Sequence, residues 1–389
     1  MIYSFGAKNY LSFREGMTVS FELNSKVPHS LSQGRKISTV LGVKGANASG
    51  KTSVLKCLAF LSNFVTSSFN REEGEDIDID SFFRNEKPTE FFIDFECFGI
   101  RYIYELKVTN KLVLREALYK KISRRTLLFE RLFNEVPKKV SELDEIDFIK
   151  LRGNASLVSS LTRYKLKKPN VDLFNAFVFF DSISGNVHSS GVLRDTFYSP
   201  ERASKVYFEN PEAFDFVKSI ISKSDLGISD IEIHERVSSS NEKEYFPIFL
   251  HNTDCGPEED RWLTSWEESS GTIALYAKLY LYWRVLKYGG VLVMDEFDIH
   301  CHPMLLPHIV GLFLDPSSNQ KNAQFIFTAH STDIIDVLGK YRVVLVSKER
   351  SESYCYRLDE IPGDLVRNDR PIAPLYREGK LGGVPRYGE

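Results

Sequence analysis

One eight-residue segment restricts the possible fold more than any other feature of this 389-residue sequence. Residues 45–52 read Gly-Ala-Asn-Ala-Ser-Gly-Lys-Thr, which matches the pattern G-x-x-x-x-G-K-[ST] in full. A short apolar run, Ser38 to Val43, precedes the segment, and apolar residues at helical spacing follow it from Ser53 to Leu61. The pattern therefore lies between an expected strand and an expected helix, the position in which it forms a phosphate-binding loop, or P-loop.

The residue types of this loop match the chemistry of nucleotide phosphates. The glycines let successive backbone N–H groups and the helix N-terminus point at phosphate oxygens. Lys51 adds a positive charge for the β- and γ-phosphates, and the Thr52 hydroxyl is an expected Mg²⁺ ligand. The expected nucleotide contacts are Gly45, Asn47, Ser49, Gly50, Lys51, Thr52 and Ser53, and the expected cofactors are ATP and Mg²⁺.

A second segment, Val291 to Met294, is an apolar strand that ends in two carboxylates, Asp295 and Glu296. Asp295 is the expected Mg²⁺ ligand, acting through water, and Glu296 is the expected base that orients and deprotonates the attacking water. The alternative is a buried strand with an acidic exit turn, which is common in α/β proteins. The P-loop in the same chain favours the functional interpretation.

A third strand end carries a histidine, since Gln324 to Thr328 is apolar and is followed by Ala329 and His330. A donor at this position could contact the γ-phosphate and report its presence. A histidine at a strand end is more often structural, but this one follows Asp295 on the next strand of the chain. We therefore place His330 with Glu296 as an expected catalytic residue.

Glu268 to Thr272 reads Glu-Ser-Ser-Gly-Thr, immediately before an apolar helix expected from Ile273 to Leu286. Serine and threonine at a helix N-terminus are ordinary N-caps, and the same groups also form an anion site. The functional interpretation is a signature loop that binds the γ-phosphate of a second subunit's ATP. It depends on the other motifs being present in the same order.

That order, continued by Asp298 after the two carboxylates and by His302-Pro303, resembles the ABC-type ATPase heads of the SMC, RecF and overcoming-lysogenization-defect group. The opening Phe-…-Lys-Asn-Tyr-Leu-Ser-Phe and the closing Tyr376 to Pro385 are most similar to single-chain bacterial ATPases of the abortive-infection and RloA-like class. The resemblance covers about residues 1–60 and 262–389.

This resemblance implies that Asp298 crosses to a partner subunit, that Ser270 and Gly271 serve the opposing ATP, and that His330 is a switch histidine. Two features depart from the family pattern. No convincing Q-loop glutamine is present between residues 60 and 100, and the signature reads SSGT rather than LSGGQ. The first departure leaves the communication between lobes without an assigned residue.

The expected fold is α/β, a two-lobed ABC-type P-loop ATPase head with an inserted mixed α/β and helical region. Short apolar strands alternating with helices predict a mainly parallel sheet covered on both faces. The alternation from Phe91 to Val108 predicts a β-hairpin turning near Phe98-Gly99, and the charged stretch 115–175 is expected to contain helical segments. The expected domains are 1–84 with the P-loop, an insertion at 85–260, and 261–389 with signature, Asp295-Glu296 and His330.

The charge and cysteine content bear on partners and compartment. With 50 basic and 53 acidic side chains, no global field favours nucleic acid or an anionic membrane. Two basic clusters, at 120–125 and 163–168, could bind phosphate backbones or could be solvated faces, which we favour. The five cysteines are far apart, and no long apolar run suggests a signal peptide or a membrane span. A cytoplasmic location is expected.

The expected function is an ATPase that dimerises around ATP and regulates a separately encoded effector in bacterial anti-phage defence. The alternative is a RecF/SMC-like DNA-binding ATPase in repair or maintenance. In the overcoming-lysogenization-defect relatives a Toprim nuclease follows the ATPase, but only 59 residues follow His330 here. The sequence therefore predicts no nuclease in this chain, and a homodimer or higher oligomer as the assembly.

Overall fold

The computed structural model describes residues 1–164, 170–188, 191–192, 199–224, 227–237, 241–253, 257, 261–299, 301–367 and 369–384. The chain forms two compact units. Unit 1 comprises Met1–Val192, Gly290–Glu296 and Asn322–Glu389, and unit 2 comprises Leu193–Gly289 and Phe297–Lys321. This grouping differs from the three expected segments, because residues 85–192 pack with the first 84 residues in one unit.

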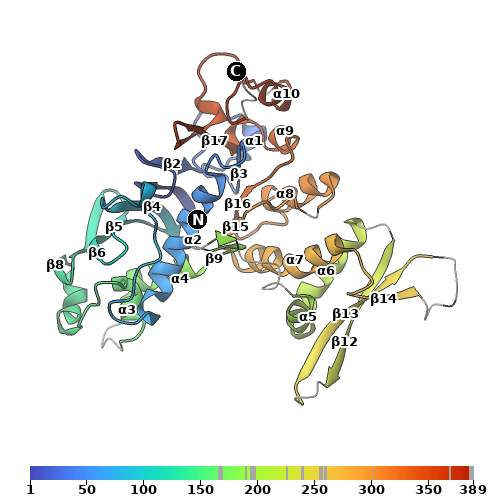
Figure 1. The fold of residues 1–389 in the computed structure, drawn as a ribbon, viewed down its shortest axis with the longest axis horizontal. Coiled ribbons are helices and arrows are strands. Elements are labelled where there is room, and N and C mark those ends of the chain that lie inside the picture. The colour runs from blue at the N-terminus through green and yellow to red at the C-terminus, as the bar shows by residue number, and fades with distance from the viewer. Residues whose placement is uncertain are drawn as a thin grey trace. The chain divides into compact units, whose positions relative to one another are not determined.

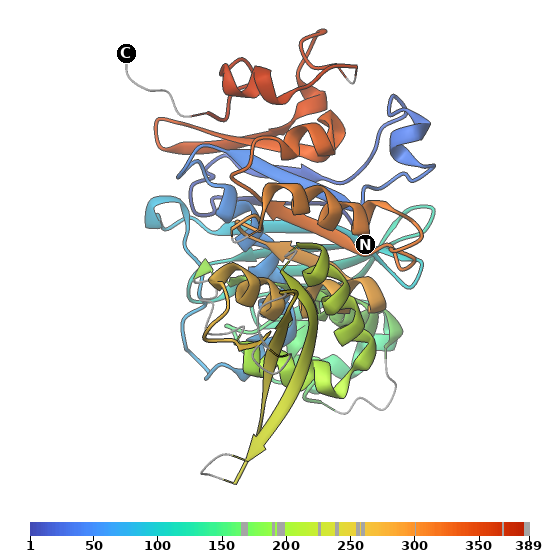
Figure 2. The same ribbon diagram turned by 90° about the vertical axis from the view of Figure 1, so that its right-hand side faces the viewer.

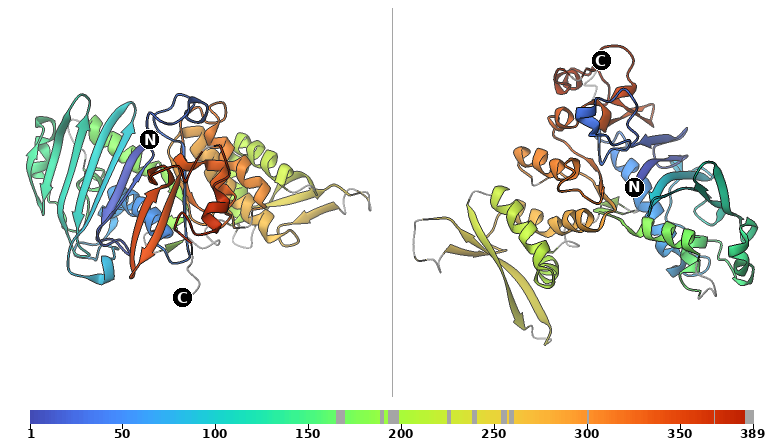
Figure 3. Two further views of the ribbon diagram at one scale, coloured as in Figure 1. Left: turned by 90° about the horizontal axis from the view of Figure 1, so that it is seen from above. Right: turned by 180° about the vertical axis from the view of Figure 1, so that it is seen from behind.

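Unit 1 contains an antiparallel seven-stranded sheet (Figure 3, left). Its strands, in spatial order, are β2 (Met17–Ser20), β1 (Ile2–Lys8), β4 (Thr89–Cys97), β5 (Ile100–Val108), β6 (Val113–Lys121), β7 (Arg125–Leu132) and β8 (Glu135–Lys139). The expected hairpin between β4 and β5 is confirmed, and it turns at Phe98 and Gly99, both at positive φ. The hairpin pairs with β1, so it continues the N-terminal sheet.

The stretch 115–175 contains helical segments, as expected, but it begins with three strands, β6, β7 and β8. Charged residues of these strands pair across the sheet: the Arg115 guanidinium lies 2.8 Å from Glu105 on β5 and 2.8 Å from Glu130 on β7. Arginine, glutamate and leucine favour helices in isolation, but cross-strand pairing and burial override that weak preference. The helical segments of this stretch are a 3₁₀ helix (Ser141–Phe148), α3 (Leu157–Leu161) and the start of α4 (Val171–Asp181).

A second sheet of unit 1 has six strands and is mainly parallel, as expected. Its order is β18 (Glu352–Arg357), β17 (Val343–Glu349), β3 (Val40–Gly45), β16 (Gln324–Thr328), β15 (Val291–Met294) and β9 (Ile183–Gly185). Only β17 and β18 pair antiparallel in this sheet. The three strands with functional motifs, β3, β16 and β15, are adjacent, so their carboxyl ends meet at one edge.

Helix α2 (Lys51–Ser67) joins the two sheets into one core (Figure 1). Its buried residues, among them Leu58 and Phe64, share one hydrophobic cluster with Phe95 of the seven-stranded sheet and Ile326 of the six-stranded sheet. The helix that begins at the P-loop is therefore held on both sides. The smaller elements of unit 1 are α1 (His29–Ser32), β10 (Val187–His188), β11 (Gly191–Val192), α9 (Ile334–Leu338) and α10 (Ala373–Arg377).

Unit 2 combines helices with a three-stranded antiparallel sheet. Its elements are α5 (Pro200–Glu209), α6 (Pro211–Ser224), β12 (Ile228–Val237), β13 (Lys243–His251), β14 (Trp262–Thr264), α7 (Ser270–Tyr288) and α8 (Leu306–Leu314). Figure 2 shows β12 and β13 as a long two-stranded ribbon. Residues 238–240, which lie between the two strands in sequence, are outside the described residues. Across the described part of the chain, we find no helix with the length and apolar character needed to span a membrane.

Candidate active site

The loop between β3 and α2 has the backbone that a P-loop requires. Ala48 has φ 60° and Gly50, the residue before α2, has φ 110°. A Cβ atom at Gly45 would lie 2.3 Å from the carbonyl oxygen of Val346, and one at Gly50 would lie 2.8 Å from the Ser12 hydroxyl. Both glycines of the motif are therefore needed for the close approach of neighbouring chain.

The polar groups of this loop fit a phosphate ligand. The ammonium of Lys51 folds back over the loop and donates to the carbonyl oxygens of Gly45 and Ala46, each at 2.9 Å. Burial lowers the pKa of Lys51, and the nearby carboxylates of Asp295 and Glu296 oppose that shift. The buried hydroxyl of Ser49 has no hydrogen-bond partner among the described residues. An anion in the loop would satisfy such groups, so the residues present fit a nucleotide phosphate.

Asp295 lies at the centre of the three strand ends and is only 4% exposed. One carboxylate oxygen accepts a hydrogen bond of 2.8 Å from the Thr52 hydroxyl at the start of α2. The other accepts a hydrogen bond of 2.5 Å from the Thr328 hydroxyl at the end of β16. The structure thus brings together Thr52 and Asp295, the two residues expected at the metal. A hydroxyl and a carboxylate are oxygen ligands of the kind that Mg²⁺ takes, so this pair fits the ion.

Glu296 and His330 also lie together. The Nε2 atom of His330 is 3.1 Å from a carboxylate oxygen of Glu296, and both side chains are about half exposed. The Glu296 backbone has φ 49°, a strained conformation for a residue other than glycine. Its N–H donates to the Thr328 hydroxyl at 2.7 Å, which helps to hold that conformation. A solvent-accessible carboxylate beside the P-loop is suited to accept a proton from water.

A cavity of about 480 Å³ adjoins the P-loop. It is bordered by the start of α2, by the turn at Leu11 and Ser12, and by Asp80 to Arg84. Phe83 on its wall is 74% exposed and has φ 48°. An exposed aromatic ring near a phosphate-binding loop is available for contact with the planar base of a nucleotide.

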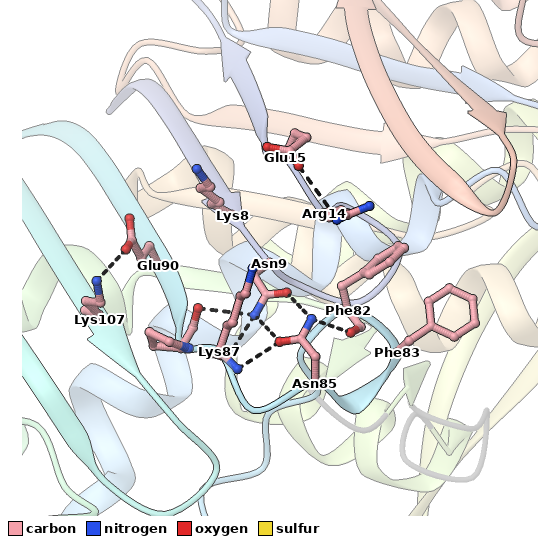
Figure 4. Close-up of a pocket in the computed structure, with 11 residues that line it drawn as sticks. Lys8, Asn9, Arg14, Glu15, Phe82, Phe83, Asn85, Lys87, Glu90 and Lys107 are labelled. Atoms are coloured by element: carbon pink, nitrogen blue, oxygen red, sulfur yellow. Dashed lines mark hydrogen bonds and ion pairs between the residues drawn. The ribbon is translucent and has the colours of Figure 1, made fainter.

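Figure 4 shows a neighbouring cavity of about 620 Å³ that shares Phe83 with the first. Here the amide groups of Asn9 and Asn85 exchange two hydrogen bonds, of 3.0 and 2.7 Å. Asn9 also donates to the carbonyl oxygens of Lys87 and Pro88. This amide pair ties the N-terminal Lys-Asn-Tyr-Leu-Ser-Phe turn to the segment that carries Phe83. The asparagine of that turn therefore has a structural role.

The protein comparisons agree with this geometry. A family model described as "AAA domain, putative AbiEii toxin, Type IV TA system" matches residues 40–336. The chain belongs to this family. It is an AAA-type P-loop ATPase domain, and its mixed α/β fold is that of such an enzyme. No curated protein matches the chain.

Among solved structures, the chain is similar to the SMC head bound to the C-winged helix domain of ScpA. The sequence identity is 14% and the TM-score is 0.49. The match covers 92% of this chain and 97% of the SMC head chain.

Two residues of the AAA domain that sequence reasoning missed support Asp295. Thr328 bridges the Asp295 carboxylate and the Glu296 N–H, as described above. The side chain of Asn186, which follows β9, accepts from the Asp295 N–H at 2.7 Å and donates to the Asp295 carbonyl oxygen at 2.9 Å. A polar residue ending a buried strand was a usable signal for Thr328. Asn186 lies in a polar Gly-Asn turn that carries no such signal.

The remaining expected residues, Ser270, Gly271 and Asp298, belong to unit 2 of the AAA domain, so their role at an ATP site stays a prediction. Helix α7 begins at Ser270 rather than near Ile273. Its N-cap is Ser269, whose hydroxyl accepts from the Thr272 N–H at 3.1 Å. The cap interpretation therefore holds for Ser269, and it leaves the exposed Ser270 and its neighbour Gly271 in the first helical turn.

Proposed function

We propose that this chain binds ATP with Mg²⁺ and hydrolyses the bond between its β- and γ-phosphates. The observation that carries the proposal is the chain of hydrogen bonds from Thr52 through Asp295 and Thr328 to Glu296, which ends at His330. This series of hydrogen bonds joins the start of the P-loop helix α2 to the ends of β15 and β16. It holds a metal ligand, a base and a histidine beside one phosphate-binding loop.

The residues divide the work of hydrolysis among them. The P-loop amides with Lys51 bind the phosphates, and Thr52 with Asp295 hold the metal. Bound Mg²⁺ supplies charge neutralisation at the phosphate oxygens. Glu296 orients a water molecule and accepts its proton. The His330 ring forms a hydrogen bond with the Glu296 carboxylate and holds it in place. Phe83 and the cavity beside it receive the nucleoside.

We further propose that two copies of the chain complete each site. Ser270 and Gly271 lie in the first turn of a 19-residue helix, where backbone N–H groups and the helix dipole favour an anion. Ser270 is exposed, so its hydroxyl can reach a ligand that another molecule carries. In this proposal the anion is the γ-phosphate bound to the second copy, with Asp298 lying at the same interface.

The biological role that we propose is anti-phage defence of the abortive-infection, RloA-like kind, through a separately encoded effector protein. The description of the matching family, which names an AbiEii toxin and a type IV toxin–antitoxin system, supports this role.

The basic cluster at 120–125 gives little support to the DNA-binding alternative. Three of its cations form ion pairs: Lys120 with Asp172, Lys121 with Asp94 and Arg125 with Glu105. Paired cations contribute less to phosphate-backbone binding. Of the second cluster, Lys165, Lys167 and Lys168 lie outside the described residues.

A nucleotide-binding measurement tests the biochemical proposal. Lys51→Ala should weaken Mg·ATP binding by about 100-fold or more, because the phosphates lose a buried charge-assisted contact. Lys56→Ala, on the same helix, is the matched control and should bind as the wild type does. Equal affinity of Lys51→Ala and wild type would refute the proposed phosphate site.

The role is tested by expressing the chain with its genomic neighbours. We expect growth arrest during phage challenge that needs both a neighbouring gene and an intact Glu296. Salt-dependent DNA binding that tightens with ATP, without any requirement for a neighbour, would instead favour the DNA-maintenance alternative.

A further inference from the structure

Lys44, which precedes the P-loop, is a buried charged residue to which neither the sequence motifs nor the proposed chemistry gives a role. It is the fifth residue of β3, the central strand that leads into Gly45, and it is 3% exposed. The β3 residues Leu41 and Val43 belong to the core around α2, so alternation along the strand turns Lys44 to the opposite face of the sheet. A buried ammonium is costly unless polar groups surround it.

Three backbone carbonyl oxygens surround this ammonium. The Nζ atom of Lys44 donates to the carbonyl oxygens of Ala329 at 2.6 Å, His330 at 2.9 Å and Ser331 at 3.0 Å. An ammonium group has three N–H donors, and here three consecutive carbonyls converge on them. The main chain of residues 329–331, which follow β16, therefore wraps around the Lys44 ammonium. Lys44 thus fixes the backbone at His330, the residue whose ring faces Glu296.

The C-terminal motif covers Lys44 from another side. The Tyr376 ring centroid lies 5.9 Å from the Lys44 Nζ atom, within the range of a cation–π contact. The Tyr376 hydroxyl donates to the Gly383 carbonyl oxygen at 2.8 Å, and burial raises the pKa of Tyr376 to about 12, so the donor stays protonated. The Gly383 N–H in turn donates to the Ser347 hydroxyl on β17 at 3.0 Å. Tyr376 to Gly383 thus forms a brace against the strand beside the P-loop.

We infer that Lys44 is a positioning residue for His330, and that the brace formed by Tyr376 and Gly383 keeps Lys44 in place. The inference rests on the proposed role of His330 in hydrolysis. Lys44 fixes the backbone of residues 329–331, and the Glu296 carboxylate contacts the His330 ring. His330 is therefore held at both its backbone and its side chain. Because Lys44 is covalently adjacent to Gly45, the first residue of the P-loop, it also joins the phosphate loop directly to the histidine segment.

A double-mutant cycle on ATP turnover is the first test. Lys44→Met removes the three donors at similar side-chain length, and it should lower kcat by the same factor as His330→Ala, within about twofold. The KM for ATP should change little, because Lys51 and Thr52 are intact. In the His330→Ala background, Lys44→Met should have no further effect. Equal loss of kcat from Lys44→Met in both backgrounds would overturn the inference.

Amide hydrogen exchange provides a readout that is independent of hydrolysis. In Lys44→Met, residues 329–331 should exchange about tenfold faster or more than in wild type, because their segment loses its anchor. Lys340→Met is the matched control, since Lys340 also donates to a carbonyl oxygen, that of Val366, and lies over the Tyr341 ring. It should leave residues 329–331 unchanged. Should Lys44→Met fail to fold, Lys44→Gln, which keeps an amide donor, serves in both measurements and should give a smaller effect.

The two failures are distinguishable. If His330→Ala hydrolyses ATP at the wild-type rate, the proposed role of His330 is wrong, and with it the catalytic part of this inference. If His330→Ala is impaired but exchange at residues 329–331 is the same in Lys44→Met and wild type, the anchoring role of Lys44 is wrong and the proposed function stands.

Discussion

At the scale of single residues, Thr328 positions two catalytic groups, although no sequence motif marks it. Its hydroxyl donates to the Asp295 carboxylate and accepts from the Glu296 N–H. The metal ligand and the base are consecutive residues, so one hydroxyl on the neighbouring strand sets the position of both.

This leads to a prediction for Thr328→Val, which keeps the shape of the side chain and removes the hydroxyl. An Asp295 oxygen and the Glu296 N–H each lose a buried partner, so we expect kcat to fall about tenfold or more, with a higher Mg²⁺ requirement. Binding of ATP should change little. Thr39→Val, a buried threonine near the other end of β3, is the control and should be as active as wild type. Unchanged turnover and Mg²⁺ dependence in Thr328→Val would contradict this account.

The sequence predicted most of these residues because the motifs fix both residue type and local position. Gly45 to Thr52 specifies a loop between strand and helix, and the ends of adjacent parallel strands must meet. The grouping of Thr52, Asp295, Glu296 and His330 follows from those two facts. Asn186 could not be predicted in this way, because its contacts with the Asp295 backbone depend on β9 pairing with β15 across more than a hundred residues.

At the scale of elements, the seven-stranded sheet contains a buried charged pair that the sequence did not indicate. The side chains of Arg131 on β7 and Glu116 on β6 are both fully buried, with Arg131 Nη1 3.3 Å from Glu116. Arg131 also donates to three carbonyl oxygens, those of Phe133, Ala155 and Arg152. Glu116 accepts from the Leu157 N–H and the Tyr104 hydroxyl as well. The pair ties β6 and β7 to the segment that leads into α3.

Removing one partner of this pair should destabilise the protein strongly. Arg131→Met leaves the Glu116 carboxylate buried without its cation, and we expect it to lower the free energy of unfolding by about 3–5 kcal/mol. Adding Glu116→Gln should recover part of the loss, because the remaining group is then neutral. Urea unfolding followed by circular dichroism measures both changes. A loss under about 1 kcal/mol in Arg131→Met would show that the pair does not support the sheet as described.

The strands between residues 113 and 139 were not predicted from the sequence. Arg115, Glu130 and Lys138 look like a solvated helix face when taken as composition, yet in the sheet they form a cross-strand ladder. Their partner strands follow in sequence, but the alternation is interrupted by register shifts between Leu118 and Tyr119 and between Glu130 and Leu132. Alternation broken in this way does not give a strand period that a sequence pattern can reveal.

At the scale of the whole molecule, the account requires two copies of the chain for each complete site. The P-loop residues belong to unit 1, and the signature residues Ser270 and Gly271 belong to unit 2. In the proposed assembly each ATP meets the first set from one copy and the second set from the other.

Complementation between two inactive variants tests this assembly. Lys51→Ala and Ser270→Arg should each be inactive alone, but a mixed dimer holds one site with an intact P-loop and an intact signature. An equal mixture should recover roughly a quarter of wild-type activity, because random pairing makes half of the dimers mixed. A mixture of Lys56→Ala with Ser270→Arg is the control. It shows the activity of mixed dimers in which both P-loops are intact and only one signature is damaged. No recovery, with mixed dimers demonstrated by tagged subunits, would argue against sites that work independently across the interface.

The central claim is that the P-loop, Asp295, Glu296 and His330 form one ATP-hydrolysing site, and Glu296→Gln tests it most directly. The amide keeps the size and the polar contacts of the side chain but cannot accept a proton, so we predict unchanged ATP affinity and a loss of hydrolysis of about 100-fold or more. Glu349→Gln, at the end of β17 in the same sheet, is the matched control and should turn over ATP normally. Hydrolysis by Glu296→Gln at the wild-type rate would contradict the account.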